Sequence, residues 1–301
     1  MKRRLEYIGI VILLAISGVF LLSHASYADP PDPGLELHWN FDEGSGTTAL
    51  DSTGNGNVGT LFNGPTYVPG HDGLAILLNG VDQYVQTNTP LASLGTVDQP
   101  YALSAWVNIA QGVSAGNIVD ISSNADGSGW CIPFLRLENG YFTATGWDTS
   151  GGVSAASTTL AATGQWNQVL TSWDATNGLR LFVNGILVAS TPQSNYAAAG
   201  VPIYASIGLS NGACSSDQGF LNGEVDDVRI YSRALAPSDI ETISTEGDPP
   251  VNLPAATTPS NAASAPTLSD TGTDVLLTST LAAIVVTSAV AVKLSKYRQS
   301  R

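Results

Sequence analysis

The stretch FLNGEVDDVRIYSRALAPSDIETI, residues 220 to 243, decides the fold of this chain. Its first half has the composition of a β-strand that closes a sandwich. In its second half Pro237 suits the first turn of a helix, and Asp239 supplies a capping oxygen and negative charge near the helix N-terminus. Ile240 and Ile243 are spaced to pack inward. We therefore predict a closing strand and then a short capped helix that covers an open end of the sandwich.

Short apolar runs separated by Gly, Asn, Asp and Ser precede this stretch, and none has the length of an ordinary helix. Asn184-Gly185, flanked by apolar residues on both sides, predicts a two-residue hairpin with a type I′ turn. Other runs of strand length are Leu35 to Phe41, Ala75 to Leu78, Tyr101 to Ile109, Ile118 to Ile121, Ile132 to Leu137, Tyr141 to Thr145, Val169 to Trp173 and Ile203 to Leu209. The pattern predicts an all-β, two-sheet antiparallel sandwich.

Several motifs upstream support the same fold. They are WNFDEGSG from Trp39, DSTGNGN from Asp51, LNGVDQYV from Leu78, LSAWVN from Leu103, QWNQVLTSWD from Gln165 and LRLFVNGILVAS from Leu179. Together with the closing stretch they resemble the LamG-like jelly-roll family, the concanavalin A-like sandwich domains of extracellular proteins. The resemblance implies a jelly-roll domain over residues 29–246. It implies little about function, because one sandwich hosts many unrelated ligands.

Residues 1–28 have the features of a secretory signal peptide with its apolar helix. Basic residues at positions 2 to 4 precede the apolar run Ile8 to Leu22, and Ser26-Tyr27-Ala28 offers a small-x-small cleavage pattern. A retained N-terminal membrane anchor is the alternative, but a run of about 15 residues is short for a span. We expect an exported protein that is cleaved before Asp29.

The other end of the chain predicts a transmembrane helix at residues 275–292. Val275 to Val292 is an 18-residue stretch without charge, followed by a basic tail at residues 293–301. A helix of this length spans about 27 Å, enough for the hydrocarbon core, and the basic tail predicts a cytoplasmic end.

Immediately before this run, LSDTG at residues 268–272 resembles the LPxTG-type sorting signal of bacterial sortase substrates. The resemblance implies recognition of Leu268 and cleavage between Thr271 and Gly272, which would attach the protein covalently to the cell wall. Ser269 stands in the usual place of proline. A plain stop-transfer anchor is the alternative.

Residues 247–267 contain five prolines among Ala, Thr, Asn and Ser. Such a segment cannot build a core, so we predict an extended, semi-rigid stalk between the sandwich and the membrane.

The exported part of the chain is strongly acidic. Of the 25 acidic residues, all but Glu6 and Asp274 lie between the end of the signal peptide and Gly272, whereas only four arginines accompany them. The resulting charge of about −19 argues against nucleic acid and against anionic lipid surfaces as partners. A negative charge of this size favours solubility, calcium binding or a salty environment.

Cys131 and Cys214 are the only cysteines. In an oxidising compartment two cysteines predict one disulfide, which would stabilise the fold by about 4 kcal/mol in the chain-entropy treatment. A catalytic cysteine is the weaker interpretation, because His24, His38 and His71 are the only histidines and His24 leaves with the signal peptide.

The carboxylates of the closing strand raise the question of catalysis. Laminarinase-type glycoside hydrolases share this sandwich and place two catalytic Glu residues on one strand, in the pattern E-x-D-x-E or E-x-D-x-x-E. Glu224-Val225-Asp226 matches the first half, but Asp227-Val228-Arg229 follows and supplies no second Glu. Retaining hydrolysis needs a pair of carboxyl groups about 5 Å apart. We therefore expect no catalysis, with a hydrolase that uses Glu224 and Asp226 as the alternative.

Calcium is the other interpretation of these carboxylates. In DSTGNGN, Asp51, Asn55 and Asn57 could place oxygens around a hard cation. The resemblance implies a structural calcium between the first strands and the last, which would add Asp226 or Asp227. The alternatives are an Asx-turn loop bonded to its own backbone, and a partner arginine for the two aspartates.

Aromatic side chains are candidates for a sugar-binding site. Trp39, Trp106, Trp166 and Trp173 stand in strand motifs and are expected in the core. Three further rings stand at strand ends or in loops and could stack against sugar faces; they are Trp130, Trp147 and Tyr196. The alternative is that they plug a sheet end.

The sequence thus predicts a non-catalytic binding or adhesion module at the cell surface, with an extracellular glycan or protein as ligand. A glycoside hydrolase relative and a structural surface protein without a discrete ligand are the two alternatives.

Overall fold

The computed structural model describes residues 32–91, 94, 96–126, 129, 131–197, 202–209 and 217–247. The predicted signal peptide, the stalk beyond Gly247, the LSDTG motif, the membrane span at 275–292 and the basic tail lie outside these residues. In the described part of the chain, no helix is long and apolar enough to cross a membrane.

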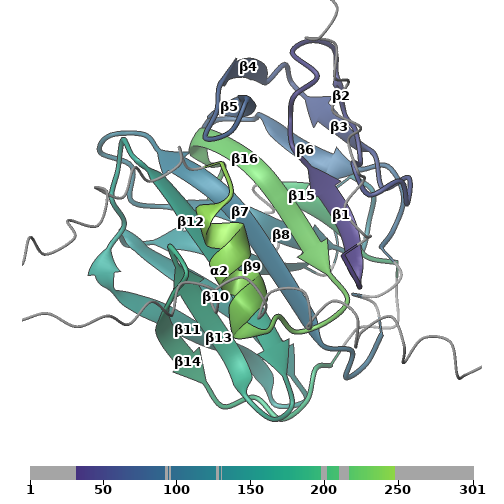
Figure 1. Ribbon diagram of the computed structural model, residues 1–301, viewed down its shortest axis with the longest axis vertical. Helices are drawn as coiled ribbons and strands as arrows, with labels where there is room; N and C mark the ends of the chain where they lie inside the picture. The colour runs from purple at the N-terminus through teal and green to yellow at the C-terminus, as the bar shows by residue number, and fades with distance from the viewer. Residues whose placement is uncertain are drawn as a thin grey trace, which may run out of the picture. The chain divides into compact units, whose positions relative to one another are not determined.

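Two antiparallel sheets form a sandwich, as predicted (Figure 1). Sheet A contains, in spatial order, β14 (Ile186–Thr191), β13 (Gly178–Val183), β12 (Trp166–Asp174), β7 (Tyr101–Ile109), β16 (Asn222–Tyr231), β5 (Leu74–Asn79) and β4 (Thr66–Pro69); β1 (Leu35–Trp39) also pairs with β16. Sheet B contains β11 (Gly151–Leu160), β10 (Tyr141–Asp148), β9 (Cys131–Glu138), β8 (Gly116–Ser122), β15 (Tyr204–Ile207), β6 (Tyr84–Thr87), β3 (Gly59–Phe62) and β2 (Thr48–Ala49).

The core lies between the two sheets and is built by side chains that alternate along the strands. Its aromatic centre joins distant parts of the chain: Trp173 and Tyr101 stack at 5.8 Å between ring centroids, and Tyr196 meets Tyr101 edge-on at 5.2 Å. The indole N–H of Trp39 donates to the carbonyl of Asn57, so this buried ring also fixes a loop. The expectation that Trp39 and Trp173 are core residues is confirmed.

The hairpin predicted at Asn184-Gly185 joins β13 to β14. Both turn residues have positive φ, 50° for Asn184 and 74° for Gly185, as a type I′ turn requires.

The predicted helix is α2 (Pro237–Thr245), which lies across the outer face of sheet A (Figure 1). Ile240 and Ile243 are buried against a second, smaller apolar cluster on that face. The Asp239 carboxylate accepts the backbone N–H of Ala236 at 3.0 Å and pairs with Arg233, which stabilises the first turn. The cluster consists of Ala102, Leu170, Phe182, Tyr231, Leu235, Ile240 and Ile243, with Leu35 packed against it.

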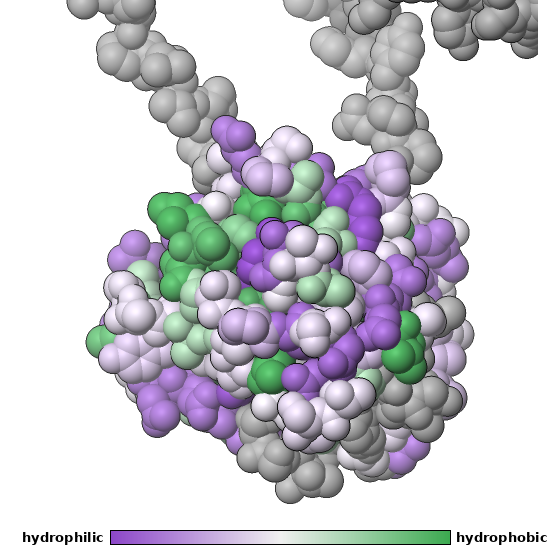
Figure 2. Space-filling model, turned by 90° about the horizontal axis from the view of Figure 1, so that it is seen from below, coloured by the Kyte–Doolittle hydropathy of each residue, from purple (hydrophilic) through white to green (hydrophobic). Residues whose placement is uncertain are grey.

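Large exposed hydrophobic side chains lie on separate segments of the chain, among them Leu50, Val81 and Ile186. On the face seen in Figure 2, hydrophobic residues gather in a few separate patches among hydrophilic ones. This face therefore offers polar contacts over most of its area.

Candidate functional site

The candidate site lies where two strands meet end to end along β16. β5 pairs with residues Asn222 to Val225 of β16, and β1 pairs with the segment from Val228 to Tyr231. Between these two segments β16 has a bulge at Asp226 and Asp227, and Asp227 has a φ of 48°. Aspartate tolerates this left-handed conformation better than most residues.

The bulge decides which side chains face outward. Val225 and Val228 both lie in the core although they are three positions apart, an odd spacing that a regular strand would place on opposite faces. The extra residue leaves Asp226 and Asp227 together at the break between β1 and β5. A sequence pattern of strict alternation cannot foresee this pairing of carboxylates.

Asp226 is almost fully buried and holds the turn between β4 and β5. Its Oδ2 accepts the backbone N–H groups of His71 at 2.9 Å and Asp72 at 3.1 Å, and its Oδ1 accepts the N–H of Asp227. The pKa of Asp226 is raised to about 7, mainly by burial. The charge of Asp227 also raises this pKa, whereas the three backbone hydrogen bonds lower it.

Asp227 lies beside two cationic or potentially cationic groups. Its Oδ1 is 2.5 Å from Nε2 of His38 on β1 and 3.0 Å from a guanidinium nitrogen of Arg229. Burial raises the pKa of Asp227, but the hydrogen bond with His38 and the charge of Arg229 outweigh it and leave the pKa below its ordinary value. The prediction that one of the two aspartates pairs with an arginine is confirmed for Asp227.

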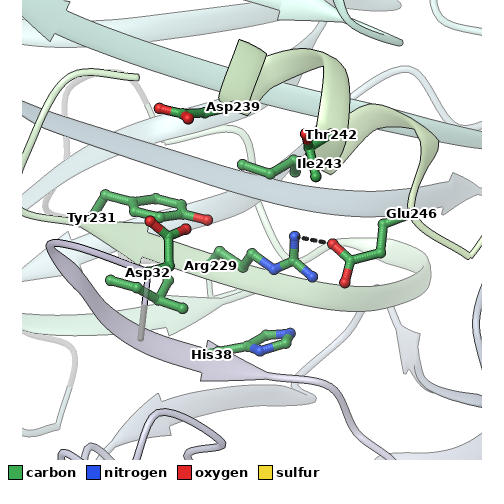
Figure 3. Close-up of a pocket in the computed structure, with 9 residues that line it drawn as sticks. Asp32, His38, Arg229, Tyr231, Asp239, Thr242, Ile243 and Glu246 are labelled. Carbon is green, nitrogen blue, oxygen red and sulfur yellow. Dashed lines mark ion pairs between the residues drawn. The ribbon is translucent and has the colours of Figure 1, made fainter. Parts of the chain in front are cut away.

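Two adjoining cavities open at this place. One of about 200 Å³ is lined by the two histidines of the domain, by Arg229 and by five carboxylates; its lining is His38, Asn40, Asp42, His71, Asp72, Asp226, Asp227, Arg229 and Glu246. The other, of about 310 Å³, lies between β1, β16 and α2. Figure 3 shows Arg229 extending toward Glu246 at the end of α2, with His38 beside it. We call the two cavities together the bulge cleft.

The wall of the bulge cleft is held rigidly. The His71 ring stacks on Trp106 with centroids 3.5 Å apart and an interplanar angle of 13°, and its edge faces Trp166. Arg229 forms a second ion pair with Glu246 at 2.7 Å. Sequence reasoning missed His38, His71 and Glu246, because they come from three segments that only the tertiary fold brings together.

Glu224, the other carboxylate of the hydrolase alternative, lies on β16 two residues before Asp226. Its Oε2 accepts the side-chain N–H of Asn108 at 2.8 Å. Both carboxylates of the hydrolase alternative therefore accept hydrogen bonds from other groups of the protein.

The predicted calcium ligands of the DSTGNGN loop form hydrogen bonds within the protein. In the DSTGNGN loop Oδ1 of Asp51 accepts the hydroxyl and N–H of Thr53 and the N–H of His38, and Oδ2 accepts the N–H of Asn57. The amide groups of Asn55 and Asn57 donate to the carbonyl of Glu36.

This geometry is that of the Asx-type loop bonded to its own backbone. No group of three or more His, Cys, Asp or Glu side chains in the described ranges is placed to hold a metal ion. Both carboxylate oxygens of Asp51 accept hydrogen bonds within the protein, and calcium in this loop stays a prediction.

The three aromatic candidates have different outcomes. Tyr196 is fully buried and its hydroxyl donates to the carbonyl of Leu94 at 2.7 Å, so the prediction of an exposed stacking ring is wrong for this residue. Its loop folds inward because the ring fills the aromatic core. Trp147 is half-buried at the end of β10, opposite Gly152. Trp130 lies outside the described residues, as does Cys214, so the disulfide to Cys131 also stays a prediction.

All four arginines of the domain are engaged in ion pairs. Arg136 pairs with Glu138 and Arg180 with Asp174, at 2.8 and 3.1 Å. Arg229 pairs with Asp227 and Glu246. Arg233 pairs with Asp32 and Asp239. Between residues 32 and 247 the sequence contains no other Lys or Arg.

Comparison with known proteins supports the fold. The family model described as "Concanavalin A-like lectin/glucanases superfamily" matches residues 79–241. The sequence has no significant match among curated proteins.

Similar solved structures include binding domains of two toxins. The binding domain of Paraclostridial Mosquitocidal Protein 1 is 16% identical with a TM-score of 0.53, covering 70% of this chain and 52% of that one. The botulinum neurotoxin serotype D/C binding domain is 13% identical with a TM-score of 0.53, and the alignment covers 71% of this chain and 52% of that one. This chain thus spans about half the length of those two.

Domain 4 of a GH43 extracellular arabinanase from Geobacillus stearothermophilus, in complex with arabinotriose, is 22% identical with a TM-score of 0.49. The alignment covers 70% of this chain and 98% of that one.

Proposed function

The chain belongs to the concanavalin A-like lectin/glucanases superfamily, and we propose that it is a non-catalytic cell-surface module that binds a neutral extracellular glycan. The bulge cleft is the proposed site.

The pairing of every arginine in the domain is the observation that carries this proposal. A site for a sulfated, sialylated or otherwise anionic ligand needs a cationic group that is available to it. Here Arg229, the arginine of the bulge cleft, is shared between Asp227 and Glu246. The surrounding carboxylates repel anions further, so the cleft favours hydroxyl groups, which donate as well as accept hydrogen bonds.

The size and lining of the cleft are consistent with a sugar. The cavity of about 310 Å³ is at the lower end of the range for small-molecule sites, roughly 300–1,000 Å³. Carboxylates and imidazoles from β1, β16 and the β4–β5 turn line the adjoining cavity of about 200 Å³. Such convergent polar groups fix the orientation of a polar ligand.

The occupied carboxylates support binding without catalysis. Asp226 accepts three backbone N–H groups and Glu224 accepts the side-chain N–H of Asn108, as expected of carboxylates with a structural role. The test is an assay of β-glucan hydrolysis with Glu224→Gln as the control. Hydrolysis by the native protein that disappears in this variant would overturn the non-catalytic part of the proposal.

A glycan array that includes neutral, sulfated, sialylated and amino sugars tests the ligand class. We expect binding to neutral glycans, weakened about tenfold by Asp72→Asn, because Asp72 lines the cleft and is exposed. Asp82→Asn is the matched control, since Asp82 is an exposed aspartate outside the cleft. Binding only to anionic glycans, or equal weakening by both variants, contradicts the proposed site. An array without any binder would favour a protein partner or a structural role.

The surface location rests on the signal peptide, the LSDTG motif and the apolar run at 275–292. Mass spectrometry of cell-wall digests tests it. A mature chain that ends at Thr271 supports sortase attachment, whereas one that retains residues 275–301 supports a plain membrane anchor.

A further inference from the structure

The outer face of sheet B carries three side-chain oxygens in a row that have no hydrogen-bond partner in the described part of the chain. They are Oε1 of Gln86, Oγ of Ser206 and Oδ1 of Asp120. The three residues lie on neighbouring strands, β6, β15 and β8. In the strand register Ser206 lies directly opposite Gln86 on one side and Asp120 on the other.

Cross-strand partners point to the same face of a sheet. The residues next to them in sequence, Val85, Ile207 and Val119, lie in the core between the sheets. Gln86, Ser206 and Asp120 therefore point away from the core, on the opposite face of sheet B. They are nevertheless buried, with exposed fractions of 1%, 0% and 1%.

The hydrogen bonds of Gln86 fix the direction of its carbonyl oxygen. Its amide nitrogen lies 3.4 Å from the backbone carbonyl of Asn124 and 3.4 Å from the hydroxyl oxygen of Ser122. A carbonyl can only accept, so the nitrogen must face Asn124 and Oε1 must face the other way. Oε1 is thus left as an acceptor without a donor.

Asp120 adds a buried carboxyl group whose Oδ1 has no hydrogen-bond donor among the described residues. Burial raises the pKa of Asp120 well above its ordinary value, and Asp217 adds to the effect. Asn117 lies between the two carboxylates, with its amide nitrogen 3.4 Å from Oδ2 of Asp120 and 2.5 Å from Oδ1 of Asp217. An ionised carboxylate in such a place is costly unless a positive charge compensates it.

The nearest arginine along the sheet does not supply that charge. Arg136 lies opposite Asn117 on β9, but its guanidinium donates to Glu138 and Thr145. The three unpartnered atoms are therefore an amide oxygen, a hydroxyl oxygen and a carboxylate oxygen, and no arginine of the described residues pairs with that carboxylate.

We propose that Asp120, Gln86 and Ser206 bind one hard cation of the calcium type on the outer face of sheet B. Carboxylate, amide and hydroxyl oxygens are the ligands that such cations take. A water molecule in the same place would satisfy Gln86 and Ser206 but would leave the charge of Asp120, which would then have to be protonated. The site is distinct from the DSTGNGN loop and does not depend on the proposed glycan.

The experiment measures calcium binding to the full chain by calorimetry and by thermal unfolding after chelator treatment. We expect calcium at about a hundred times its Kd to raise the Tm of the native protein by about 5 °C. Asp120→Asn, which has nearly the same shape but no charge, should lose this rise. Asp51→Asn should keep it, because Asp51 lies in the DSTGNGN loop.

Ser206→Ala provides a second variant, since the Ser206 hydroxyl bonds to no described group and its loss leaves no partner unsatisfied. It should weaken calcium binding about tenfold without lowering the Tm in chelator. A calcium effect that survives in Asp120→Asn and is lost in Asp51→Asn would place the ion in the DSTGNGN loop and overturn the proposal. The absence of any calcium binding to the native protein would overturn it as well.

Discussion

Nε2 of His38 and Oδ1 of Asp227 lie 2.5 Å apart, although the two residues are separated by 189 positions in the sequence. The contact joins the first strand of the sandwich to the bulge in its last strand. The same oxygen accepts a guanidinium N–H of Arg229 at 3.0 Å, so two donors converge on one carboxylate atom. This carboxylate is the link between β1, β16 and, through Arg229, the end of α2.

Asp227→Asn should lower the free energy of unfolding by about 3 kcal/mol, because it leaves a buried arginine without one of its carboxylates. Asparagine tolerates the positive φ of this position, so the backbone should be little affected. Urea unfolding measures the change. Asp82→Asn, at an exposed carboxylate far from β16 in the sequence, is the control, and a small loss of the same size in both variants would contradict the role of Asp227.

Asp226 should make the protein less stable as the pH rises. Its pKa is about 7 in the folded protein, against an ordinary value of 3.8 for the unfolded chain, so the folded state binds more protons between these two values. This contribution is fully present below about pH 4 and is lost as the pH rises through about 7. Urea unfolding in chelator at pH 5 and pH 8 should differ less in Asp226→Asn than in the native protein. An unchanged difference would show that Asp226 is ionised throughout.

Gly185→Ala should destabilise the protein more than Gly112→Ala. Both glycines have a similar positive φ, 74° and 81°, so alanine is strained by about 1 kcal/mol at either position. A Cβ at Gly185 would lie 2.6 Å from Oγ of Ser244 in α2, whereas nothing lies within 4 Å of a Cβ at Gly112. The difference between the two melting temperatures isolates the contact of the hairpin with the helix.

Tyr196→Phe should cost about 1 kcal/mol of stability, because the carbonyl of Leu94 loses its buried donor. It should leave glycan binding unchanged. Trp147→Ala tests the remaining prediction, that the half-buried Trp147 ring stacks against a sugar face. Loss of binding in Tyr196→Phe without loss of stability would contradict a purely structural tyrosine.

Asp51→Asn should lower stability in the presence of chelator as well as calcium, because its four accepted hydrogen bonds are internal to the protein. We expect a loss of about 2 kcal/mol by urea unfolding. A loss that occurs only in calcium would instead support the ion predicted for this loop.

The local parts of the fold were predictable because their signals are local. Asn184-Gly185 specifies its own turn, and Ile240 with Ile243 mark the buried side of α2. The short apolar runs indicated most of the strands of both sheets. β11 was missed because its sequence, GGVSAASTTL, is largely small and polar and faces solvent along one side.

The bulge cleft was not predictable in the same way. Asp226 and Asp227 stand out in the sequence, but their surroundings depend on β1 and β5 meeting end to end along β16. Neither His38 nor His71 carries a pattern that points to this place. Tyr196 was misjudged for a related reason: a ring in a loop is exposed or buried according to tertiary packing, which the residues around it do not reveal.

The central position of β16 has a consequence for the order in which the protein can fold. This strand lies between β7 on one side and β5 with β1 on the other, so the first strand of the domain gains its sheet partner only when residues 228–231 are available. The N-terminus is synthesised first, so nearly the whole domain must be made before sheet A can be completed. Contacts of such long sequence separation make folding slow. β1 should thus stay without its sheet partner until β16 has been made.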